Sequence, residues 1–420
     1  MTKNGYKQTE IGIIPEDWEL LSFDDAFSFL SNAAYSREQL SDNGEIYYVH
    51  YGDIHMKWNH FLNLKDEQLP TITKSLLKNF SLIRENDLIM ADASEDYDGI
   101  GKSIEIVNIG DKNVISGLHT FLLRDKNNHF VPKFKAYLHS NKLIKKNYDK
   151  YATGLKVYGV SKTNLKKILI PLPPKPEQTA IATTLSSIDS LITSLQKLID
   201  KKKMIKHGAM QELLTGKRRL PGFHGEWINK PIKELGKVIN GGTPSTFVDL
   251  FWNGDIAWAT PTDITGTQGK YIYETERYLT NDGLQKSSAQ LLPKGTILLC
   301  SRATIGELKI ADIPITTNQG FKSIICNNNC DNQFLYYKLL TIKNLLIEKA
   351  IGSTFLEISK NETENLVLFI PDNFIEQTAI STILSDLDLE IERLETKLFK
   401  LKSLKLGAMQ QLLTGKIRLL

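Results

Sequence analysis

Two stretches of this 420-residue chain are repeated almost without change, and this repeat constrains the fold more than any other feature. Residues 177–181 (EQTAI) return as 376–380, and residues 208–217 (GAMQELLTGK) return as 407–416 with a single substitution. Both pairs are 199 residues apart, so the segment between them has the same length in each copy. A chain that preserves the length of two segments while the remainder diverges uses these segments as spacers.

The composition is that of an ordinary soluble protein, with 41% hydrophobic and 24% charged residues, and the length allows two or three domains. A net charge of +4 is too small for indiscriminate binding of nucleic acid, so any such binding must come from local patches. The three cysteines include no CxxC pair, and we expect no metal site. The N-terminus has no apolar signal segment, and no apolar run approaches the roughly 20 residues that span a bilayer. We therefore expect a cytoplasmic protein without a membrane partner.

The repeat includes the regions that surround the spacers. Trp18 corresponds to Trp227 near the start of each half, and 160–162 (VSK) corresponds to 358–360 (ISK) near its end. The chain thus alternates between globular and helical parts. We expect a first globular domain at 1–172, a first helical spacer at 173–216, a second globular domain at 217–371 and a second helical spacer at 372–420.

The globular parts carry mixed secondary-structure signals. Short β-branched and aromatic runs such as 46–49 and 324–325 alternate with Gly, Asn and Asp turn clusters. Helical stretches at 134–147 and 334–349 come late in each half. We predict an α+β fold with two mixed α/β globular domains, each with a mostly antiparallel or mixed sheet, separated by a long antiparallel two-helix coiled coil. The fold is then a pseudo-two-fold internal repeat.

Both spacers carry apolar residues at heptad spacing, which a partner helix must cover. The predicted seam consists of Ile181, Leu185, Ile188, Ile192, Leu195 and Ile199 in the first spacer, and of Ile380, Leu384, Leu387, Ile391, Leu394, Leu398 and Leu401 in the second. Asn373 and Glu376 have the spacing of a capping box at the start of the second helix. Gly216 and Gly415 stand where left-handed C-terminal caps are expected.

The charges favour antiparallel pairing of the two helices. Lysines 197, 201, 202, 203 and 206 occupy the second half of the first helix, whereas acidic residues 386, 388, 390, 392 and 395 occupy the first half of the second. Surface ion pairs contribute only about 0–1 kcal/mol each, but they discriminate between orientations. Gly208 and Gly407 lie within the helices and indicate either a close approach of another helix or a tolerated kink.

A helix of about 38 residues is roughly 57 Å long. This length covers on the order of 16 base pairs of duplex DNA at 3.4 Å per pair. Two different globular domains held at such a distance would read two different DNA segments with unread pairs between them.

The chain resembles the specificity subunits of type I restriction-modification enzymes. The resemblance covers essentially the whole chain and depends on 171–173 (PLP) with 177–178 (EQ), the heptad helix, 213–223 (LLTGKRRLPGF), 412–416 (LLTGK), 116–120 (SGLHT) and 317–321 (TNQGF). Each motif alone is weak, but two copies at a constant offset are specific.

The resemblance implies a non-catalytic recognition subunit. In that family two target-recognition domains each read one half of a bipartite site in double-stranded DNA. The helices set the spacer and dock two methyltransferase (modification) subunits, and motor-nuclease (restriction) subunits attach to that core. The family's cofactors, S-adenosylmethionine, ATP and Mg²⁺, are then expected on the partner subunits and none in this chain.

We find no catalytic motif in the sequence, which is consistent with a recognition subunit. The segment 172–175 (LPPK) lacks both flanking residue types of an amino-methyltransferase motif, and a phosphate loop ending in 101–103 (GKS) would need glycine at Asp96. The acidic run 92–98 is typical of a surface loop more than of a metal site. The hypothesis of an autonomous nuclease is therefore disfavoured, because the sequence offers no convincing active site for it. The main rival hypothesis is a coiled-coil scaffold that joins two protein-binding domains.

Reading DNA requires Arg, Lys, Asn, Gln, Ser or Thr on loops that face the groove or the phosphates. The candidates in the first globular domain are Arg37, Tyr51, His55, Ser94, Lys102, His119, Lys156, Ser161 and Lys162. The candidates in the second are Thr243, Ser245, Thr260, Thr262, Ser301, Arg302, Thr304, Asn318, Gln319, Ser353, Thr354, Ser359 and Lys360. We expect Arg302 to contact guanine, with a solvated arginine or an internal salt bridge as the alternatives, and the two Ser-Lys pairs to contact phosphates.

Overall fold

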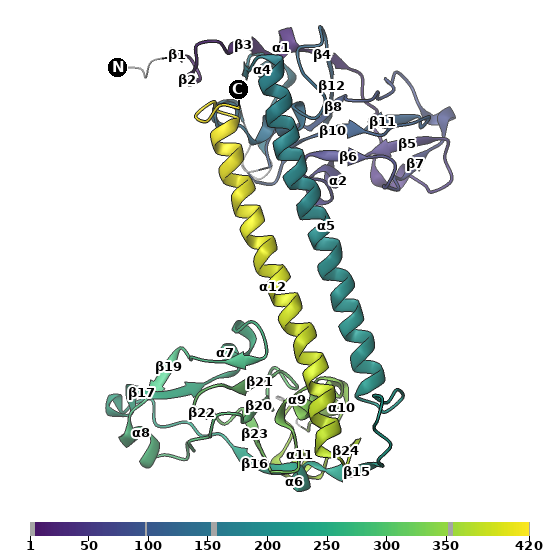
Figure 1. The fold of residues 1–420 in the computed structure, drawn as a ribbon. Coiled ribbons are helices and arrows are strands. Elements are labelled where there is room, and N and C mark those ends of the chain that lie inside the picture. Colours follow the sequence, from purple (N-terminus) through teal and green to yellow (C-terminus); the bar gives the residue numbers. More distant parts are fainter. Residues whose placement is uncertain (1–4, 97–98, 153–157, 352–355, 420) are drawn as a thin grey trace. The chain divides into compact units, whose positions relative to one another are not determined.

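The structure is a computed structural model, and it describes residues 5–96, 99–152, 158–351 and 356–419 (Figure 1). The chain forms two compact units. Unit 1 consists of residues 1–194 and 398–420, and unit 2 of residues 195–397. Each unit therefore takes in one globular part and portions of both helical segments.

Unit 1 is built on a mixed five-stranded sheet in the order β4 (Phe27–Leu30), β12 (Thr120–Asp125), β8 (Leu88–Ala91), β10 (Ser103–Val107) and β6 (Phe61–Asn63), with only the β10–β6 pair parallel. A three-stranded sheet has the order β11 (Val114–Ser116), β5 (Ile46–Val49) and β7 (Thr71–Ile72). The two-stranded pairs are β1 (Tyr6–Thr9) with β2 (Gly12–Pro15), β3 (Glu19–Ser22) with β14 (Leu169–Leu172), and β9 (Ala93–Ser94) with β13 (Tyr158–Gly159). The helices are α1 (Phe23–Ala26), α2 (Tyr51–Met56), α3 (Lys142–Tyr151) and α4 (Lys162–Lys166), with 3-10 turns at Arg37–Gln39, Lys74–Leu76 and Lys135–Ser140.

Unit 2 repeats this arrangement. Its five-stranded sheet has the order β16 (Gly236–Asn240), β23 (Phe321–Cys326), β20 (Ile297–Cys300), β21 (Leu308–Ala311) and β18 (Tyr271–Ile272), again with one parallel pair at the edge. The three-stranded sheet is β19 (Arg277–Leu279), β17 (Trp252–Ala259) and β22 (Ile315–Thr317), and β15 (Trp227–Pro231) pairs with β24 (Val367–Pro371). The helices are α6 (Ile232–Leu235), α7 (Pro261–Gly266), α8 (Asn281–Gln285), α9 (Asn332–Leu340), α10 (Lys343–Glu348) and α11 (Lys360–Asn365), with a 3-10 turn at Asp249–Phe251. The prediction of two mixed, sheet-rich α/β domains is confirmed.

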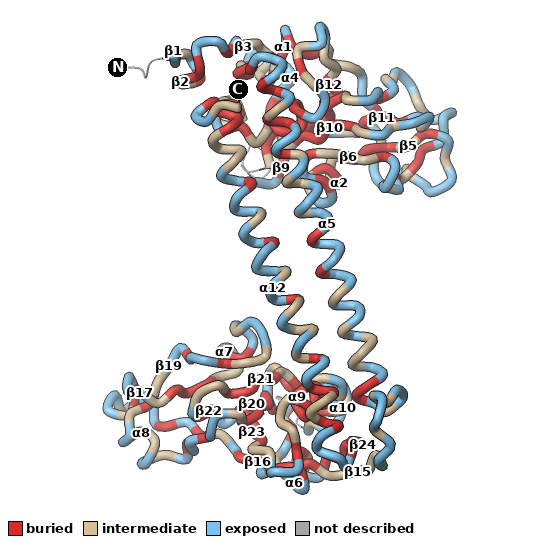
Figure 2. The backbone as a smooth tube through the Cα atoms, viewed as in Figure 1, coloured by how far each residue is buried: buried red, intermediate tan, exposed pale blue. Residues whose placement is uncertain are grey.

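The buried core of each unit includes parts of the long helices. In unit 1, Ile181 and Leu185 pack in one cluster with Leu412 and Leu413 and with residues of the sheet. In unit 2, Ile380 and Leu384 pack in the same way with Leu213 and Leu214. Figure 2 shows that buried stretches of the two long helical segments lie beside the buried strands of each unit. The helical segments are therefore part of the hydrophobic core of each unit.

The two long helices have equal length, as the repeat predicts. Helix α5 (Lys175–Leu213) and helix α12 (Phe374–Leu412) each contain 39 residues. Every residue of the predicted apolar seam is buried or half-buried, and none is exposed. The helices end as expected, because Gly216 and Gly415 adopt the left-handed conformation with φ of +72° and +67°.

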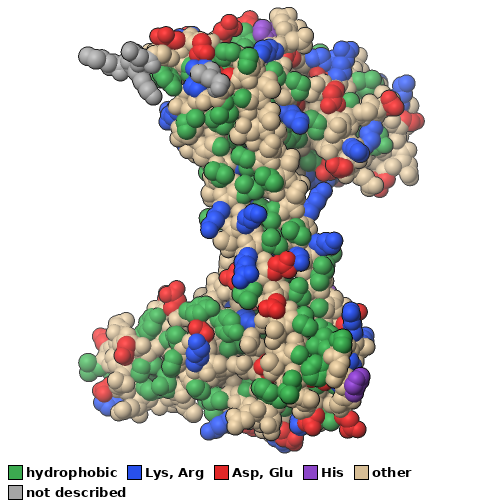
Figure 3. All heavy atoms as spheres, viewed as in Figure 1, with side chains coloured by type: hydrophobic (Ala, Val, Ile, Leu, Met, Phe, Trp, Pro, Cys, Tyr) green, Lys and Arg blue, Asp and Glu red, His purple; other side chains and the backbone are tan. Residues whose placement is uncertain are grey.

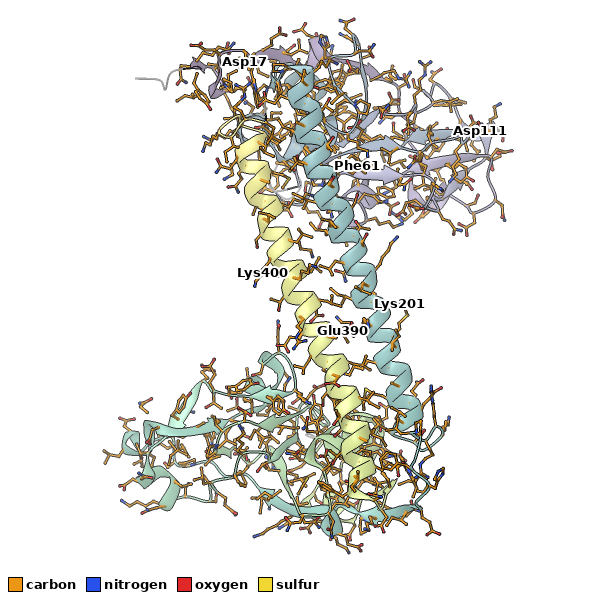
Figure 4. The ribbon with its side chains drawn as sticks, viewed as in Figure 1. Asp17, Phe61, Asp111, Lys201, Glu390 and Lys400 are labelled. Atoms are coloured by element: carbon orange, nitrogen blue, oxygen red, sulfur yellow. The ribbon has the colours of Figure 1, made fainter. Side chains whose placement is uncertain are left out.

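Three of the predicted ion pairs join the two helical segments within unit 2. Lys203 lies 2.7 Å from Glu395, Lys202 lies 2.7 Å from Glu390, and Lys206 lies 2.5 Å from Asp388. Lys201 and Glu390 mark this stretch of α5 and α12 in Figure 4. From Lys203 to Lys206 the residue number rises along α5, whereas the number of the paired residue on α12 falls from 395 to 388. The segments of these helices in unit 2 are therefore antiparallel.

A polar network recurs where a globular part meets the start of each helix. In unit 1 the buried carboxylate of Glu177 accepts hydrogen bonds from Trp18 Nε1 at 2.9 Å and from Arg418 at 2.6 and 2.8 Å. Arg418 also binds Asp17, which Figure 4 labels. In unit 2, Glu376 accepts from Trp227 Nε1 at 3.3 Å and from Arg219 at 2.6 and 2.7 Å. Each buried carboxylate is thus neutralised by a bidentate arginine.

A second repeated network joins a tyrosine of each globular part to both helices. Tyr137 donates to Asp189 at 2.7 Å, and Asp189 pairs with Lys405. In unit 2, Tyr337 donates to Asp388 at 2.6 Å, and Asp388 pairs with Lys206. Burial and the neighbouring carboxylate raise the pKa of both tyrosines, so each remains a neutral hydrogen-bond donor.

The predicted capping box is wrong, and one of the two alternatives for the helical glycines is excluded. The Glu376 side chain binds Arg219 and Trp227 in place of closing a capping box with Asn373, whose side chain accepts from Ile375 N at 2.8 Å. A Cβ added at Gly208 or Gly407 would meet no atom within 4 Å, so neither glycine allows a close approach by another helix of this chain. The burial of Glu376 outweighs the local signal in the first case.

Candidate nucleic-acid interface

Four loops of unit 2 bring residues that are distant in sequence onto one surface. They follow β16 (241–245), β17 (260–265), β20 (301–304) and β22 (318–320). Backbone hydrogen bonds tie them together: Gly242 N donates to Thr317 O at 2.8 Å, Asn318 N to Ala259 O at 3.0 Å, and Ser301 N to Gly320 O at 2.7 Å. The side chains of Thr243 and Gln319 are hydrogen-bonded to each other. The predicted residues of these loops therefore belong to one surface.

The loop at 241–245 is held by close backbone packing and by two indole groups. A Cβ at Gly241 would lie 1.7 Å from Asn318 O, and one at Gly242 would lie 2.4 Å from Ser288. Trp258 Nε1 donates to Gly242 O, and Trp252 Nε1 donates to Ser245 O, each at 3.0 Å. Only glycine fits both positions, and the loop presents Thr243 and Ser245 to solvent.

The predicted residues at the start of α7 have different roles. Thr260 donates its hydroxyl proton to Asp263 at 2.6 Å and caps the helix, so its hydroxyl is already engaged. Thr262 and Gln319 are exposed, and Asn318 is half-buried with its side-chain oxygen accepting from Gly320 N at 2.8 Å. Thr262 and Gln319 are exposed to solvent, whereas the Thr260 hydroxyl is engaged by Asp263, and contact of these residues with DNA stays a prediction.

Arg302 forms the salt bridge that the sequence left open as an alternative. Its Nε lies 2.6 Å from Glu357, which Lys322 also binds at 2.9 Å. Burial acts to raise the pKa of Glu357, but hydrogen bonds from Arg302 and Lys322 lower it overall. Ser301 is fully buried, with its hydroxyl 3.4 Å from Lys322 Nζ, and cannot face a ligand. Arg302 and the half-buried Thr304 line a cavity of about 1000 Å³ with Thr265 and Glu357.

The corresponding loops of unit 1 assemble a chain of charged and aromatic contacts. Arg37 donates to Asp53 at 3.0 Å and lies 3.3 Å from His50 Nδ1. The ring of Tyr51 lies 4.7 Å from His50 and 5.3 Å from His119. His119 in turn lies 3.2 Å from Asp92, whose pKa is raised by burial. The structure thus brings Arg37, Tyr51 and His119 together, and it adds His50 and Asp92 to the predicted set.

A cavity of about 760 Å³ in unit 1 is lined by Tyr51, His55, Met56, Ser94, Lys102 and His119, among others. Lys102 Nζ donates to His55 O at 2.8 Å, and burial lowers its pKa. His55 Nε2 lies 2.9 Å from Ala93 O. Ser94 is buried and its hydroxyl accepts from Asp96 N at 3.3 Å, so it shapes the loop, and its contact with DNA stays a prediction.

The two Ser-Lys pairs are helix starts. Ser161 accepts from Asn164 N at 3.2 Å and caps α4, and Ser359 accepts from Glu362 N at 3.1 Å and caps α11. Lys360 lies 3.5 Å from Glu364, whereas Lys162 is exposed over the ring of Phe29. The serines therefore have a local structural role that explains their recurrence. Lys156, Ser353 and Thr354 lie outside the described residues.

On the face shown in Figure 3, basic and acidic side chains are interspersed on both units. Among the described residues, no group of three or more His, Cys, Asp or Glu side chains could hold a metal ion. No helix in the described part of the chain is long and apolar enough to cross a membrane.

Comparison with known proteins places the repeat in a family. A model of the type I restriction modification DNA specificity domain matches residues 15–203 and again residues 224–403. The chain belongs to this family. Its membership confirms the family resemblance seen in the sequence and explains why the architecture repeats, since one copy of the family domain occupies each half.

The chain is similar in sequence to type I specificity subunits and similar in fold to one of known structure. A putative type I restriction enzyme specificity subunit of Methanocaldococcus jannaschii is 29% identical over 99% of this chain and 97% of its own length. A second specificity subunit of that organism is 41% identical, over 40% of this chain and 39% of its own length. The crystal structure of a type I specificity subunit from M. genitalium matches with a TM-score of 0.60 and 16% identity over 98% of this chain and 97% of that one, a likeness of fold. The family's specificity subunits are non-catalytic, which confirms the prediction that this chain is not an enzyme.

Proposed function

We propose that this specificity subunit reads a bipartite, asymmetric site in double-stranded DNA, with one half-site for the loops of each unit. The observation that supports this proposal is that equivalent loops on equivalent sheets carry different side chains. Unit 1 presents Arg37, Tyr51 and His119, whereas unit 2 presents Thr243, Thr262 and Gln319. Similar frameworks with dissimilar reading residues suit two different half-sites.

Direct reading of bases is consistent with the chemistry of these groups. Gln pairs with adenine, hydroxyl groups contact several bases, and carboxylates such as Asp92 accept from cytosine N4. The two cavities supply concave surfaces beside these groups. Lys162, which is exposed over the ring of Phe29, is a cation placed to contact phosphate in this proposal.

The helical segments set the distance between the half-sites in this proposal. Helices α5 and α12 would form one antiparallel coiled coil that separates target-recognition domains at 1–172 and 217–371, with helical spacers at 173–216 and 372–420. Equal helix length, the covered seam and the three ion pairs of unit 2 support this arrangement. Two methyltransferase subunits would dock on the helices, and motor-nuclease subunits would join them. S-adenosylmethionine, ATP and Mg²⁺ would be bound by those partners.

Selection from a library of random DNA duplexes tests the proposal. The full chain, alone and with methyltransferase subunits from the same host, is expected to enrich duplexes with two defined segments separated by a gap of constant length. Competition at fixed salt then measures the preference. Equal affinity for every duplex, with the methyltransferase present, would favour a coiled-coil scaffold that joins two protein-binding domains.

A further inference from the structure

Each unit exposes one large apolar side chain more than any other that the structure describes in that unit. In unit 2 this residue is Phe247, which is 97% exposed. In unit 1 it is Met56, which is 85% exposed. Phe247 follows the loop 241–245 of the candidate interface and Met56 ends α2 beside the cavity of unit 1, although the two are not equivalent in the repeat. The most exposed large apolar side chain of each unit thus lies at the candidate interface, and this coincidence requires an explanation.

Phe247 is presented by a tightly held loop. Val248 N donates to Ser245 O at 3.4 Å, so Phe247 lies within the turn that these two residues close. Trp252 Nε1 holds Ser245 O from one side, and Phe251 N donates to Val248 O at 3.0 Å from the other. The aromatic ring therefore projects from an anchored loop that also carries Thr243 and Ser245. Leu250, 77% exposed, follows it in the same loop.

Met56 ends the short helix that carries Tyr51 and His55. Its neighbour Lys57 closes the helix by donating its backbone N–H to Asp53 O at 2.8 Å, and Asp53 is fixed by Arg37. Met56 lines the cavity of unit 1 together with Tyr51, His119 and Lys102. It is therefore surrounded by the polar and aromatic groups that we assign to DNA.

Apolar side chains on DNA-binding surfaces contact thymine methyl groups or insert between base steps. Phe and Met are among the residues that enter between base steps, where they replace base stacking and bend the duplex. A ring on an anchored loop loses little conformational entropy on binding, unlike one on a mobile segment. Full exposure in the free protein also maximises the apolar area that a base contact can cover.

We propose that Phe247 and Met56 are apolar contacts to nucleobases, one in each half-site, and that they insert against a base step beside the polar reading groups. This inference rests on the proposed reading of DNA. It assigns a different physical task to these side chains: they stabilise a local deformation of the duplex, whereas the polar groups select the bases.

The test uses the full chain and the duplex enriched by the selection described above. Phe247→Ala should weaken binding by about 5- to 150-fold, the range for loss of one base stack, whereas Phe247→Trp should restore most of it. Met56→Ala should weaken binding at least about fivefold. On short duplexes with a single half-site, each substitution should act on one half-site and leave the other unchanged. A 2-aminopurine placed beside the affected step should lose its binding-induced fluorescence change in the variant.

Matched controls are Val367→Ala on β24 and Ile13→Ala on β2, which are 53% and 50% exposed and lie outside the reading loops. Both should bind as the wild type does, and thermal unfolding should show that all variants are folded. If the wild type is selective but Phe247→Ala and Met56→Ala match their controls, the apolar contacts are refuted while the proposed function stands. If a variant no longer binds methyltransferase subunits but keeps the wild-type affinity for DNA, the proposed contacts to bases are also refuted, in favour of a contact with protein. A wild type without sequence preference overturns the proposed function itself.

Discussion

At the scale of single residues, stability depends strongly on the partners of the buried charges. Glu177 and Glu376 lie inside the units, and each is compensated by one bidentate arginine and one indole N–H. A buried carboxylate that loses its cation becomes an uncompensated charge in a medium of low dielectric constant. These contacts are therefore sensitive to a single substitution in a way that the surface pairs are not.

Arg418→Met should destabilise unit 1 by about 3–5 kcal/mol, because it removes the cation but keeps the length of the side chain. Urea unfolding measures the change. Arg218→Met is the control, because Arg218 pairs with Glu212 on an exposed surface at 3.5 Å and should cost at most about 1 kcal/mol. Adding Glu177→Gln to Arg418→Met should recover part of the loss. Equal effects of the two arginine substitutions would contradict the importance of burial.

Lys338 gives unit 2 a dependence on alkaline pH. It is 7% exposed, donates to Leu214 O at 2.7 Å, and its pKa is lowered by burial from 10.5 to about 8. The unfolded chain therefore binds more protons than the folded one between pH 8 and 10.5, so stability rises with pH through this window. The full cost applies below about pH 8.

Relative to Lys338→Met, the wild-type protein should gain about 2 kcal/mol of unfolding free energy between pH 7.5 and 9.5. Hydrogen exchange of β20 and β23 during urea titration follows unit 2 separately. The variant serves as the reference for the wild type at each pH, since all other groups titrate in both proteins. A difference between the two proteins that stays constant with pH would show that Lys338 keeps its ordinary pKa.

At the scale of elements, the long helices combine a covered seam with two glycines that contact nothing nearby. Gly208 and Gly407 lie inside α5 and α12, and neither has a positive φ. Glycine within a helix costs about 1 kcal/mol relative to alanine because of its backbone freedom. The isolated chain therefore retains a destabilising residue twice without an internal structural reason.

Gly208→Ala and Gly407→Ala should each stabilise the chain by about 0.5–1 kcal/mol in thermal or urea unfolding. The C-terminal caps are the matched controls: a Cβ at Gly216 would lie 3.1 Å from the Trp227 ring and one at Gly415 would lie 2.5 Å from Pro15, both at positive φ. Alanine at either cap should destabilise. Destabilisation by the two helical substitutions would mean that the helices pack differently from the structure.

At the scale of the whole molecule, the repeat gives the chain two frameworks of one design with dissimilar surfaces. The family domain occurs twice, and the loops that follow equivalent strands carry histidines and charges in unit 1 but mainly hydroxyl and amide groups in unit 2. Under the proposed function, divergence of the loops would change the half-sites without disturbing the sheets, because loops lie mainly outside buried cores.

Insertion of one heptad into both α5 and α12 tests the spacing role of the helices. Seven residues add about 10 Å of helix, so the preferred gap between half-sites should grow by about three base pairs. Binding selection with the altered chain measures the gap, and both half-sites should stay the same. Insertion into one helix alone is the control and should impair folding, because it shifts the seam out of register. An unchanged gap would contradict the spacer proposal.

Much of the architecture could be predicted because its signals are local or repeated. Heptad spacing marks the helices, glycine marks their ends, and blocks of opposite charge favour antiparallel segments, as Lys203 with Glu395 and Lys206 with Asp388 show in unit 2. The candidate site was partly predictable, because Tyr51, His119, Thr243 and Gln319 follow strands and turns that can be read directly. His50 was missed although it precedes Tyr51, since a single histidine at a strand end carries no specific signal.

The sequence by itself determined the repeat, the equal helices and the family, because periodicity and duplication survive in the order of residues alone. Only the tertiary structure decided which charges are available. Arg302 binds Glu357, and Arg418 binds Glu177 at a separation of 241 residues. The hydroxyl groups of Ser94, Ser161 and Ser359 accept hydrogen bonds in local turns and helix caps. Burial and partner choice depend on neighbours that the fold brings from distant positions, and a linear pattern does not contain them.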